Sequence, residues 1–385
     1  MASAAISATV RGGRRPRSSL RAWHLWFGLV IGPWLALLAL TGSVIAFYDD
    51  LDRQLNADLR TVAAAHGAGP VAVDRAVANA VASLPGFLPR MIDLPNRPGD
   101  TIRMVGSARS ESVGAEPISV YVFAHPGTGA LLGWREPGRV AFDRRHILDL
   151  IYGLHVELLA GHIGAWLIGL AALFWLVDHI PATILAVPRL KGIAAAMRVS
   201  GSAGSLRRLY DLHRAPGLWL LPFTLMLALT GWCLAWPEES RAIFGHLSRV
   251  SGRLHYAMPD RETSAPGISA EQALAVFATR HGARIDSIQP LPRKGLYAVR
   301  SFHPRDPDDM GRLWTYISME DGRTIAERHD MGTSASDAFF GWQYPLHSGR
   351  AFGLSGRIFI AALGLATFML WLSGLMLWRR RQRRR

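Results

Sequence analysis

The stretch HLWFGLVIGPWLALLALTG (residues 24–42) decides the fold, because the chain repeats it as HRAPGLWLLPFTLMLALTG (residues 213–231). The two stretches align without a gap. Each is apolar and near the length of about 20 residues that a membrane span needs. The sequence therefore predicts an internal two-fold repeat in which each half opens with a span. The matched positions are His24 and His213, Gly28 and Gly217, Pro33 and Pro222, and Thr41-Gly42 and Thr230-Gly231.

Two further apolar runs complete the halves, so four segments of the 385-residue chain are predicted to span a membrane. The segments preceding these runs also match, since HVELLAGHIG (155–164) aligns with HSGRAFGLSG (347–356) and pairs His155 with His347. The first span is interpreted as retained rather than as a cleaved signal peptide, because its apolar run is too long. The predicted spans lie at about 25–47, 158–180, 217–236 and 356–378.

The formal charge of +14 is gathered in three arginine-rich clusters, before the first span, between the second and third, and after the fourth. The positive-inside rule then predicts that both termini and the middle loop are cytoplasmic. The clusters are interpreted as topology signals that contact anionic lipid, and nothing else in the sequence indicates nucleic-acid binding. The single cysteine, Cys233, leaves no disulfide framework.

Each outer segment has the pattern of a small α+β domain. In the second, SAEQALAVFATRHG (269–282) has a serine cap, apolar helical spacing and a glycine stop, which predict a helix. Strand patterns follow, and the last two predict a hairpin that turns at Asp321-Gly322. The first segment predicts a helix over 72–83, strands over 101–106 and 118–134, and a loop over 105–117.

The predicted architecture is an α-helical membrane protein, a four-transmembrane-helix bundle from an internal two-fold repeat with two small α+β outer domains. Its predicted segments are a basic cytoplasmic N-terminus (1–22), spans at 23–48, 151–181, 213–236 and 346–378, outer domains at 49–150 and 237–345, a cytoplasmic loop (182–212) and an Arg-rich tail (379–385).

This topology places the four matched histidines at two depths. His24 and His213 begin spans that run outward, so they lie near the cytoplasmic face, whereas His155 and His347 lie near the outer face. A repeat axis along the membrane normal sets the members of each pair across the bundle. Two imidazoles at one depth suit axial ligation of haem iron.

Small residues are predicted to admit the macrocycle. Gly28 and Gly217 lie one helical turn from the cytoplasmic pair. No Cys-x-x-Cys-His motif is present, so the predicted cofactor is haem b, in two copies that form an electron path across the bilayer. The glycines near the outer pair are Gly153, Gly161, Gly349 and Gly353.

Other interpretations stay open. A histidine at the end of a span needs no cofactor, and a transition-metal site, which normally takes about three or four ligands, is the rival interpretation. His179 is an alternative to His24 or His213 as an inner ligand, and His146 is placed to line the outer site. Four aromatic residues are interpreted as a belt at the membrane interface, in preference to an aromatic surface above the outer site. They are Trp134, Trp314, Trp342 and Tyr344.

The His-x3-Gly…Thr-Gly spans, the outer histidines and the two helix-plus-sheet domains resemble PepSY-associated transmembrane helix proteins over residues 20–380. These are bacterial inner-membrane proteins, some of which reduce ferric siderophores for iron uptake with two b haems. The resemblance implies PepSY-like periplasmic domains and haem ligation by the four matched histidines. The second span departs from the pattern, because it ends WLVDHIPATIL where a step like Ser373-Gly374 is expected.

The resulting prediction is a haem-dependent reductase that takes electrons from a cytoplasmic or quinol donor and delivers them to a ferric siderophore or another ferric chelate. No nucleotide-binding fingerprint is present in the chain. The alternative is a non-enzymatic, membrane-anchored protein whose outer domains bind or inhibit a periplasmic partner. A transporter is disfavoured, because the spans are predicted to lack charged or broken-helix sites.

Overall fold

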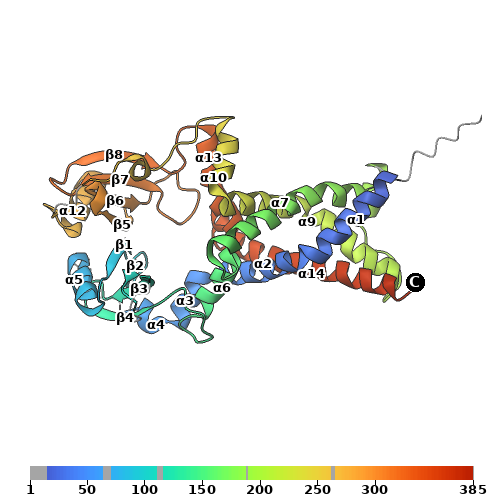
Figure 1. Ribbon diagram of the computed structural model, residues 1–385, viewed down its shortest axis with the longest axis horizontal. Helices are drawn as coiled ribbons and strands as arrows, with labels where there is room; N and C mark the ends of the chain where they lie inside the picture. Colours follow the sequence, from blue (N-terminus) through green and yellow to red (C-terminus); the bar gives the residue numbers. More distant parts are fainter. Residues whose placement is uncertain (1–14, 64–70, 111–115, 188–189, 262–264, 385) are drawn as a thin grey trace, which may run out of the picture.

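The computed structural model of the protein describes residues 15–63, 71–110, 116–187, 190–261 and 265–384. Long helices pack side by side in one half of the elongated molecule, and a β-sheet occupies the other half (Figure 1). We call the end of the helices next to the sheet the sheet end, and the opposite end, where the C-terminus lies, the terminal end. Part of the predicted loop 105–117 lies outside the described residues, as do four basic topology signals, Arg11, Arg14, Arg189 and Arg385.

Three helices are long and apolar enough to cross a membrane: α7 (Gly161–Ala186), α9 (Leu206–Ala235) and α14 (Gly353–Gln382). A fourth apolar segment is broken into α1 (Arg15–Val30) and α2 (Gly32–Ile45), which are bent by 52°. The break falls at Gly32-Pro33, where proline lacks an N–H and its ring clashes with the carbonyl four residues earlier, and the preceding glycine disfavours a helix. The matched Leu221-Pro222 lies inside the unbroken α9, so the proline alone does not cause the break. The first predicted span is therefore a broken one, contrary to the expectation of no broken helices.

The apolar helices pack on one another through a minority of their side chains. Helix α7 packs against α9 and α1, and α14 packs against α2 and α9. Many of their large apolar side chains are exposed, among them Trp26, Ile163, Ile180 and Trp219. An exposed apolar surface of this kind suits contact with lipid rather than water.

Two shorter helices, α6 (Ile147–Glu157) and α13 (Ala335–Ser348), carry His155 and His347. The sequence predicts that both histidines begin a span. The structure instead ends each short helix just after its histidine and turns the chain before the span begins. The turn after α6 has positive φ at Leu158 (51°), Leu159 (55°) and Gly161 (56°), and the turn after α13, which contains η3 (Arg350–Phe352), has positive φ at Gly349 (75°) and Gly353 (58°). Three of the glycines predicted to admit a macrocycle, Gly161, Gly349 and Gly353, therefore serve these turns.

The strands form one antiparallel sheet of eight, in the order β4-β3-β2-β1-β5-β6-β7-β8. Two separate sheets were expected from the sequence. The halves join where β1 pairs with β5, through Ile92 with Ile288 and Asp93 with Ser287. The strands are β1 (Leu88–Asp93), β2 (Ile102–Ala108), β3 (Ile118–Ala124), β4 (Leu131–Arg135), β5 (Ile285–Leu291), β6 (Leu296–Ser301), β7 (Leu313–Ser318) and β8 (Thr324–His329).

The two faces of the sheet differ because side chains alternate along each strand. Helices α5 (Val73–Ser83) and α12 (Ala270–His281) cover the apolar face and bury a core that includes Ile92, Met104 and Val299. Their strand neighbours Asp93, Arg103 and Arg300 point to the other face and line a cavity beside the helices. The sheet is thus apolar on the side of α5 and α12 and charged toward the spans.

Several local predictions agree with the structure. Ser269 caps α12 in a capping box with Gln272, and Gly282 ends the helix in the left-handed conformation. The predicted hairpin is β7 and β8. Trp314 is a correction, because it is fully buried in the sheet and packs against Leu254 rather than joining an interface belt. The remaining helices are α3 (Tyr48–Leu55), α4 (Ala57–Arg60), η1 (Leu190–Gly192), α8 (Ile193–Ala196), α10 (Pro237–Gly245), α11 (Leu254–Ala257) and η2 (Pro292–Lys294).

Candidate functional site

The helices bring the four matched histidines together as two pairs. At the terminal end, the ring centroids of His24 on α1 and His213 on α9 lie 6.1 Å apart, with the ring planes at 52°. At the sheet end, the centroids of His155 on α6 and His347 on α13 lie 6.3 Å apart, with the planes at 54°. Each pair takes one histidine from each of the two matched halves of the sequence.

Threonine hydroxyls orient the sheet-end pair. Thr41 Oγ1 lies 3.1 Å from Nδ1 of His155, and Thr230 Oγ1 lies 2.9 Å from Nδ1 of His347. Each hydroxyl donates its only proton to a main-chain carbonyl of its own helix, so toward the imidazole it is an acceptor. Nδ1 of both histidines therefore carries the proton, which leaves the lone pair on Nε2.

The glycine that follows each threonine makes room for the imidazole. A Cβ on Gly42 would lie 2.9 Å from Cε1 of His155, and a Cβ on Gly231 would lie 3.3 Å from Cε1 of His347. The Thr-Gly step, which the sequence repeats without an evident role beyond packing, thus supplies a hydrogen-bond acceptor and a close approach for one histidine in each half.

The terminal-end pair is held by different groups. Nδ1 of His213 lies 3.0 Å from the carbonyl oxygen of Leu370 and 3.1 Å from Ser373 Oγ, and a Cβ on Gly374 would meet its ring at 2.9 Å. Nδ1 of His24 lies 2.8 Å from a carboxylate oxygen of Asp178. A carbonyl and a carboxylate only accept, so these two imidazoles also carry the proton on Nδ1.

The sequence pattern predicted no role for Asp178 and showed only that WLVDHIPATIL lacks a Ser/Thr-Gly step. An acidic residue within an apolar span is by default a candidate for a functional role, and that signal was present. His179, its neighbour, bonds groups other than the four paired histidines. Its Nδ1 donates to the carbonyl of Trp175 at 2.6 Å. The Thr224 hydroxyl lies 3.2 Å from the carbonyls of its own helix, farther than Thr41 (2.9 Å) and Thr230 (2.8 Å) lie from theirs, and it donates to Nε2 of His179 at 3.1 Å, so both ring nitrogens are engaged.

The other residues predicted near the pairs have separate surroundings. A Cβ on Gly28 would meet no atom within 4 Å, and one on Gly217 would only touch Leu370 at 3.6 Å, so neither glycine is needed for a close contact. His146 bonds Asp143 at 2.8 Å and lines a different, smaller cavity from the one that His155 lines.

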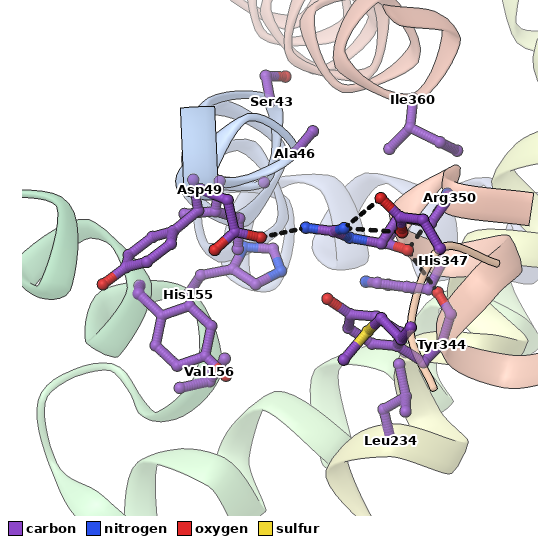
Figure 2. A pocket seen from close by; sticks show the side chains of 18 of the residues that line it. Ser43, Ala46, Asp49, His155, Val156, Leu234, Tyr344, His347, Arg350 and Ile360 are labelled. Atoms are coloured by element: carbon purple, nitrogen blue, oxygen red, sulfur yellow. Dashed lines mark hydrogen bonds and ion pairs between the residues drawn. The ribbon is translucent and has the colours of Figure 1, made fainter. Parts of the chain in front are cut away.

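The sheet-end pair lies in a cavity of about 850 Å³, within the range of about 300 to 1,000 Å³ that is usual for cofactor and small-molecule sites. Figure 2 shows His155 and His347 reaching into it from two helices, with Tyr344 and Arg350 beside them. Toward the terminal end the cavity is bounded by apolar side chains of the spans, among them Leu35, Trp175 and Ile360.

The sheet side of the same cavity is charged, with seven arginines and five aspartates among the described residues that line it. Arg350, which lies between α13 and α14, bonds Asp49 on α3 at 2.6 Å (Figure 2). It also bonds Asp309, in the loop before β7, at 2.9 Å. Burial opposes the charge on Asp49, but Arg103 and Arg350 outweigh it and hold the pKa of this carboxyl below its usual value. Burial and the nearby Arg103 lower the pKa of Arg60.

The pair geometry fits a metal held between two imidazoles. A bond from a first-row transition metal to imidazole nitrogen is about 2.0 Å long, so two such bonds in line set the ring centroids roughly 6 Å apart. The separations of 6.1 and 6.3 Å agree with this value. In the part of the chain that the structure describes, no group of three or more His, Cys, Asp or Glu side chains is arranged to hold a metal ion.

Comparison with known families agrees with the helical architecture and its candidate spans. No curated protein matches the chain significantly. The family model described as the PepSY-associated TM region matches residues 21–381, which is nearly the whole chain. The protein is therefore a member of the PepSY-associated TM family, a family of transmembrane proteins.

Proposed function

We propose that the protein is a di-haem electron-transfer protein of a bacterial inner membrane that reduces ferric chelates, such as ferric siderophores, on the periplasmic side. In this proposal the four apolar segments span the bilayer, both termini are cytoplasmic and the sheet is periplasmic. The clusters of arginine at the terminal end support this orientation, and the small number of charged residues within the spans supports their insertion in the bilayer.

The observation that carries the proposal is the spacing and tautomer of the two histidine pairs. His155 and His347 would hold one haem b through Nε2, and His24 and His213 would hold the other. A bound haem supplies a one-electron Fe(III)/Fe(II) couple. The Thr, Ser and Asp partners fix the ring orientation through Nδ1, which is the usual arrangement behind a metal-binding histidine.

The cavity supports the substrate side of the proposal. It runs from the sheet-end pair to the charged face of the sheet, so one opening serves both a redox group and an exposed ligand. Guanidinium groups bind the oxygen atoms of carboxylates and similar groups well, and ferric chelates are rich in such oxygens. Reduction weakens the hold of an oxygen-donor chelator on iron, and the metal is then released.

The alternative is a non-enzymatic protein in which the spans are anchors and the sheet binds or inhibits a periplasmic partner. It leaves the two histidine pairs, their four oriented rings and the cavity around one pair without a role. Nothing in the described residues favours it over electron transfer.

An absorption spectrum of detergent-purified protein from haem-replete cells tests the cofactor. We expect reduced b-type bands and about two haems per chain. A folded but colourless protein would overturn the proposal. Reductase activity is a second measurement, in which dithionite-reduced protein is mixed with a ferric chelate. Reoxidation no faster than with haem-free protein would exclude the reductase activity even with haem bound.

A further inference from the structure

The four paired imidazoles differ in the group that faces Nδ1. Three of them face a neutral oxygen, either a hydroxyl or a main-chain carbonyl. Only His24 faces a carboxylate, with Asp178 Oδ2 at 2.8 Å and Oδ1 at 3.1 Å from Nδ1. The two sites are therefore unequal, although the sequence stretches that carry the histidines match.

The charge of Asp178 is directed at this imidazole. Its side chain is 4% exposed, and within the described ranges His24 is its one ion-pair partner. No arginine or lysine among those residues forms a salt bridge with it. A carboxyl inside an apolar helix is costly, so its position beside one histidine indicates a specific effect.

A carboxylate that accepts from Nδ1–H raises the basicity of the imidazole as a metal ligand. A more basic ligand stabilises the higher oxidation state, and ligand donor strength is one of the means by which a protein sets a haem potential. A threonine hydroxyl or a carbonyl, being neutral, has a smaller effect of the same kind.

We infer that Asp178 is a positioning residue that sets the direction of electron flow. Through His24 it lowers the reduction potential of an iron at the terminal-end pair below that of an iron at the sheet-end pair. This inference rests on the proposed function. It adds a difference in reduction potential between the two sites, and this difference favours electron transfer from the terminal end toward the sheet end.

The transfer balances with one electron. His24 and His213 would hold an iron that accepts one electron from a reduced donor at the terminal side, of the quinol or reduced-carrier class. His155 and His347 would hold a second iron that receives this electron and gives it to a ferric chelate in the cavity, whose iron becomes ferrous. Each site would return to its starting oxidation state, and no covalent bond would form or break in the protein.

A purely structural role for Asp178 predicts a different result. An Asp178–His24 ion pair that only joins α1 to α7 would affect stability when it is removed and leave the potentials alone. The test therefore measures potentials. Optical redox titration of the purified holoprotein gives two midpoint potentials, and haem-deficient variants assign them. We expect the lower potential to vanish in His213→Ala and the higher one to vanish in His347→Ala.

Asp178→Asn then removes the charge while it keeps an oxygen acceptor. We expect the lower potential to rise, the higher potential to stay unchanged and both haems to remain low-spin. Thr224→Val is the matched control, because it removes a buried hydroxyl that touches neither pair, and it should leave both potentials in place. Asp178→Glu, which retains the carboxylate, should keep the wild-type order of the potentials.

Three outcomes overturn the inference. One is an unchanged lower potential in Asp178→Asn with both haems bound. Another is assignment of the lower potential to the sheet-end pair in the wild type, a result that decides the question even where Asp178→Asn loses haem. The third is equal potentials at both sites. In each of these cases the wild type binds haem and the proposed function stands. A haem-free wild type would overturn both the inference about Asp178 and the proposed function.

Discussion

Thr41 and His155 form a hydrogen bond of 3.1 Å between residues 114 positions apart in the chain. The threonine lies near the end of α2, and the histidine lies on α6, which precedes the next span. The Thr41 hydroxyl donates its proton to the carbonyl of Leu37 on its own helix, so it accepts a hydrogen bond from Nδ1 of His155. The bond therefore also selects the tautomer of the imidazole. The first apolar segment thus determines which nitrogen of the His155 imidazole carries the proton, in addition to any role as an anchor.

Alanine at Gly42 should displace His155. The added Cβ would lie 2.9 Å from Cε1 of the ring, whereas the same change at Gly231 would place a Cβ 3.3 Å from Cε1 of His347. With haem bound as proposed, we expect Gly42→Ala to lower the haem content at the sheet end more than Gly231→Ala does. Haem per chain and the low-spin spectrum measure this, and Gly28→Ala, which meets no neighbour within 4 Å, is the control. An order reversed between the two variants would contradict the prediction.

If the protein binds two haems as proposed, replacing His179 should leave both in place. Its two ring nitrogens already bond Trp175 and Thr224, so it has no lone pair to offer a metal. We expect His179→Ala to keep two haems per chain and to lower the free energy of unfolding by roughly 1 to 3 kcal/mol, since a hydrogen bond is lost and a buried group is exposed or left unpaired. Loss of one haem in this variant, but not in His213→Ala, would show that the terminal-end pair is wrongly assigned.

The Arg350–Asp49 ion pair should couple the sheet end of the spans to α3. Because Asp49 is partly exposed, solvent weakens the pair, and we expect a coupling of about 1 kcal/mol in a double-mutant cycle with Arg350→Gln and Asp49→Asn. Thermal unfolding in detergent measures it. The cycle with Asp309→Asn in place of Asp49→Asn is the matched comparison, and additive effects at both positions would refute the coupling.

Acid should weaken the same contact. The pKa of Asp49 is lower in the folded protein than the value of about 3.9 for a free aspartate. The stabilisation is therefore complete above pH 4 and is lost as the pH falls through the lower folded pKa. We expect the stability difference between wild type and Asp49→Asn to shrink below pH 4, as followed by thermal unfolding at several pH values. A difference that is constant down to pH 3 would exclude this contribution.

Local patterns were the part of the fold that the sequence predicted well. The cap of α12 at Ser269 and the turn at Asp321-Gly322 depend on a few adjacent residues. The break at Gly32-Pro33 is not of this kind, because the matched Pro222 lies inside an unbroken helix. The matched histidines were found because their register survives in both halves. The contact of Asp178 with His24 joins residues 154 positions apart, so no local pattern indicates it.

Local sequence patterns also do not predict that the two four-stranded halves join in one sheet. The pairing of β1 with β5 rests on two residue pairs, and the strands on either side each form a complete four-stranded pattern without it. Hydrophobic alternation predicts that a strand exists and which face it buries, but not which edge it meets. The separate sheets expected from the sequence were a reasonable reading of each half taken alone.

Each histidine receives its Nδ1 partner from its own half of the chain, while each pair draws its two rings from different halves. Such an arrangement has the form of an isologous dimer interface, in which the same patch on two identical subunits meets itself. In a true homodimer any acid placed behind one ring would also stand behind the other. Joining both copies in one polypeptide frees them to diverge, and Asp178, with its counterpart region at Leu370 and Ser373, is where that freedom has been used.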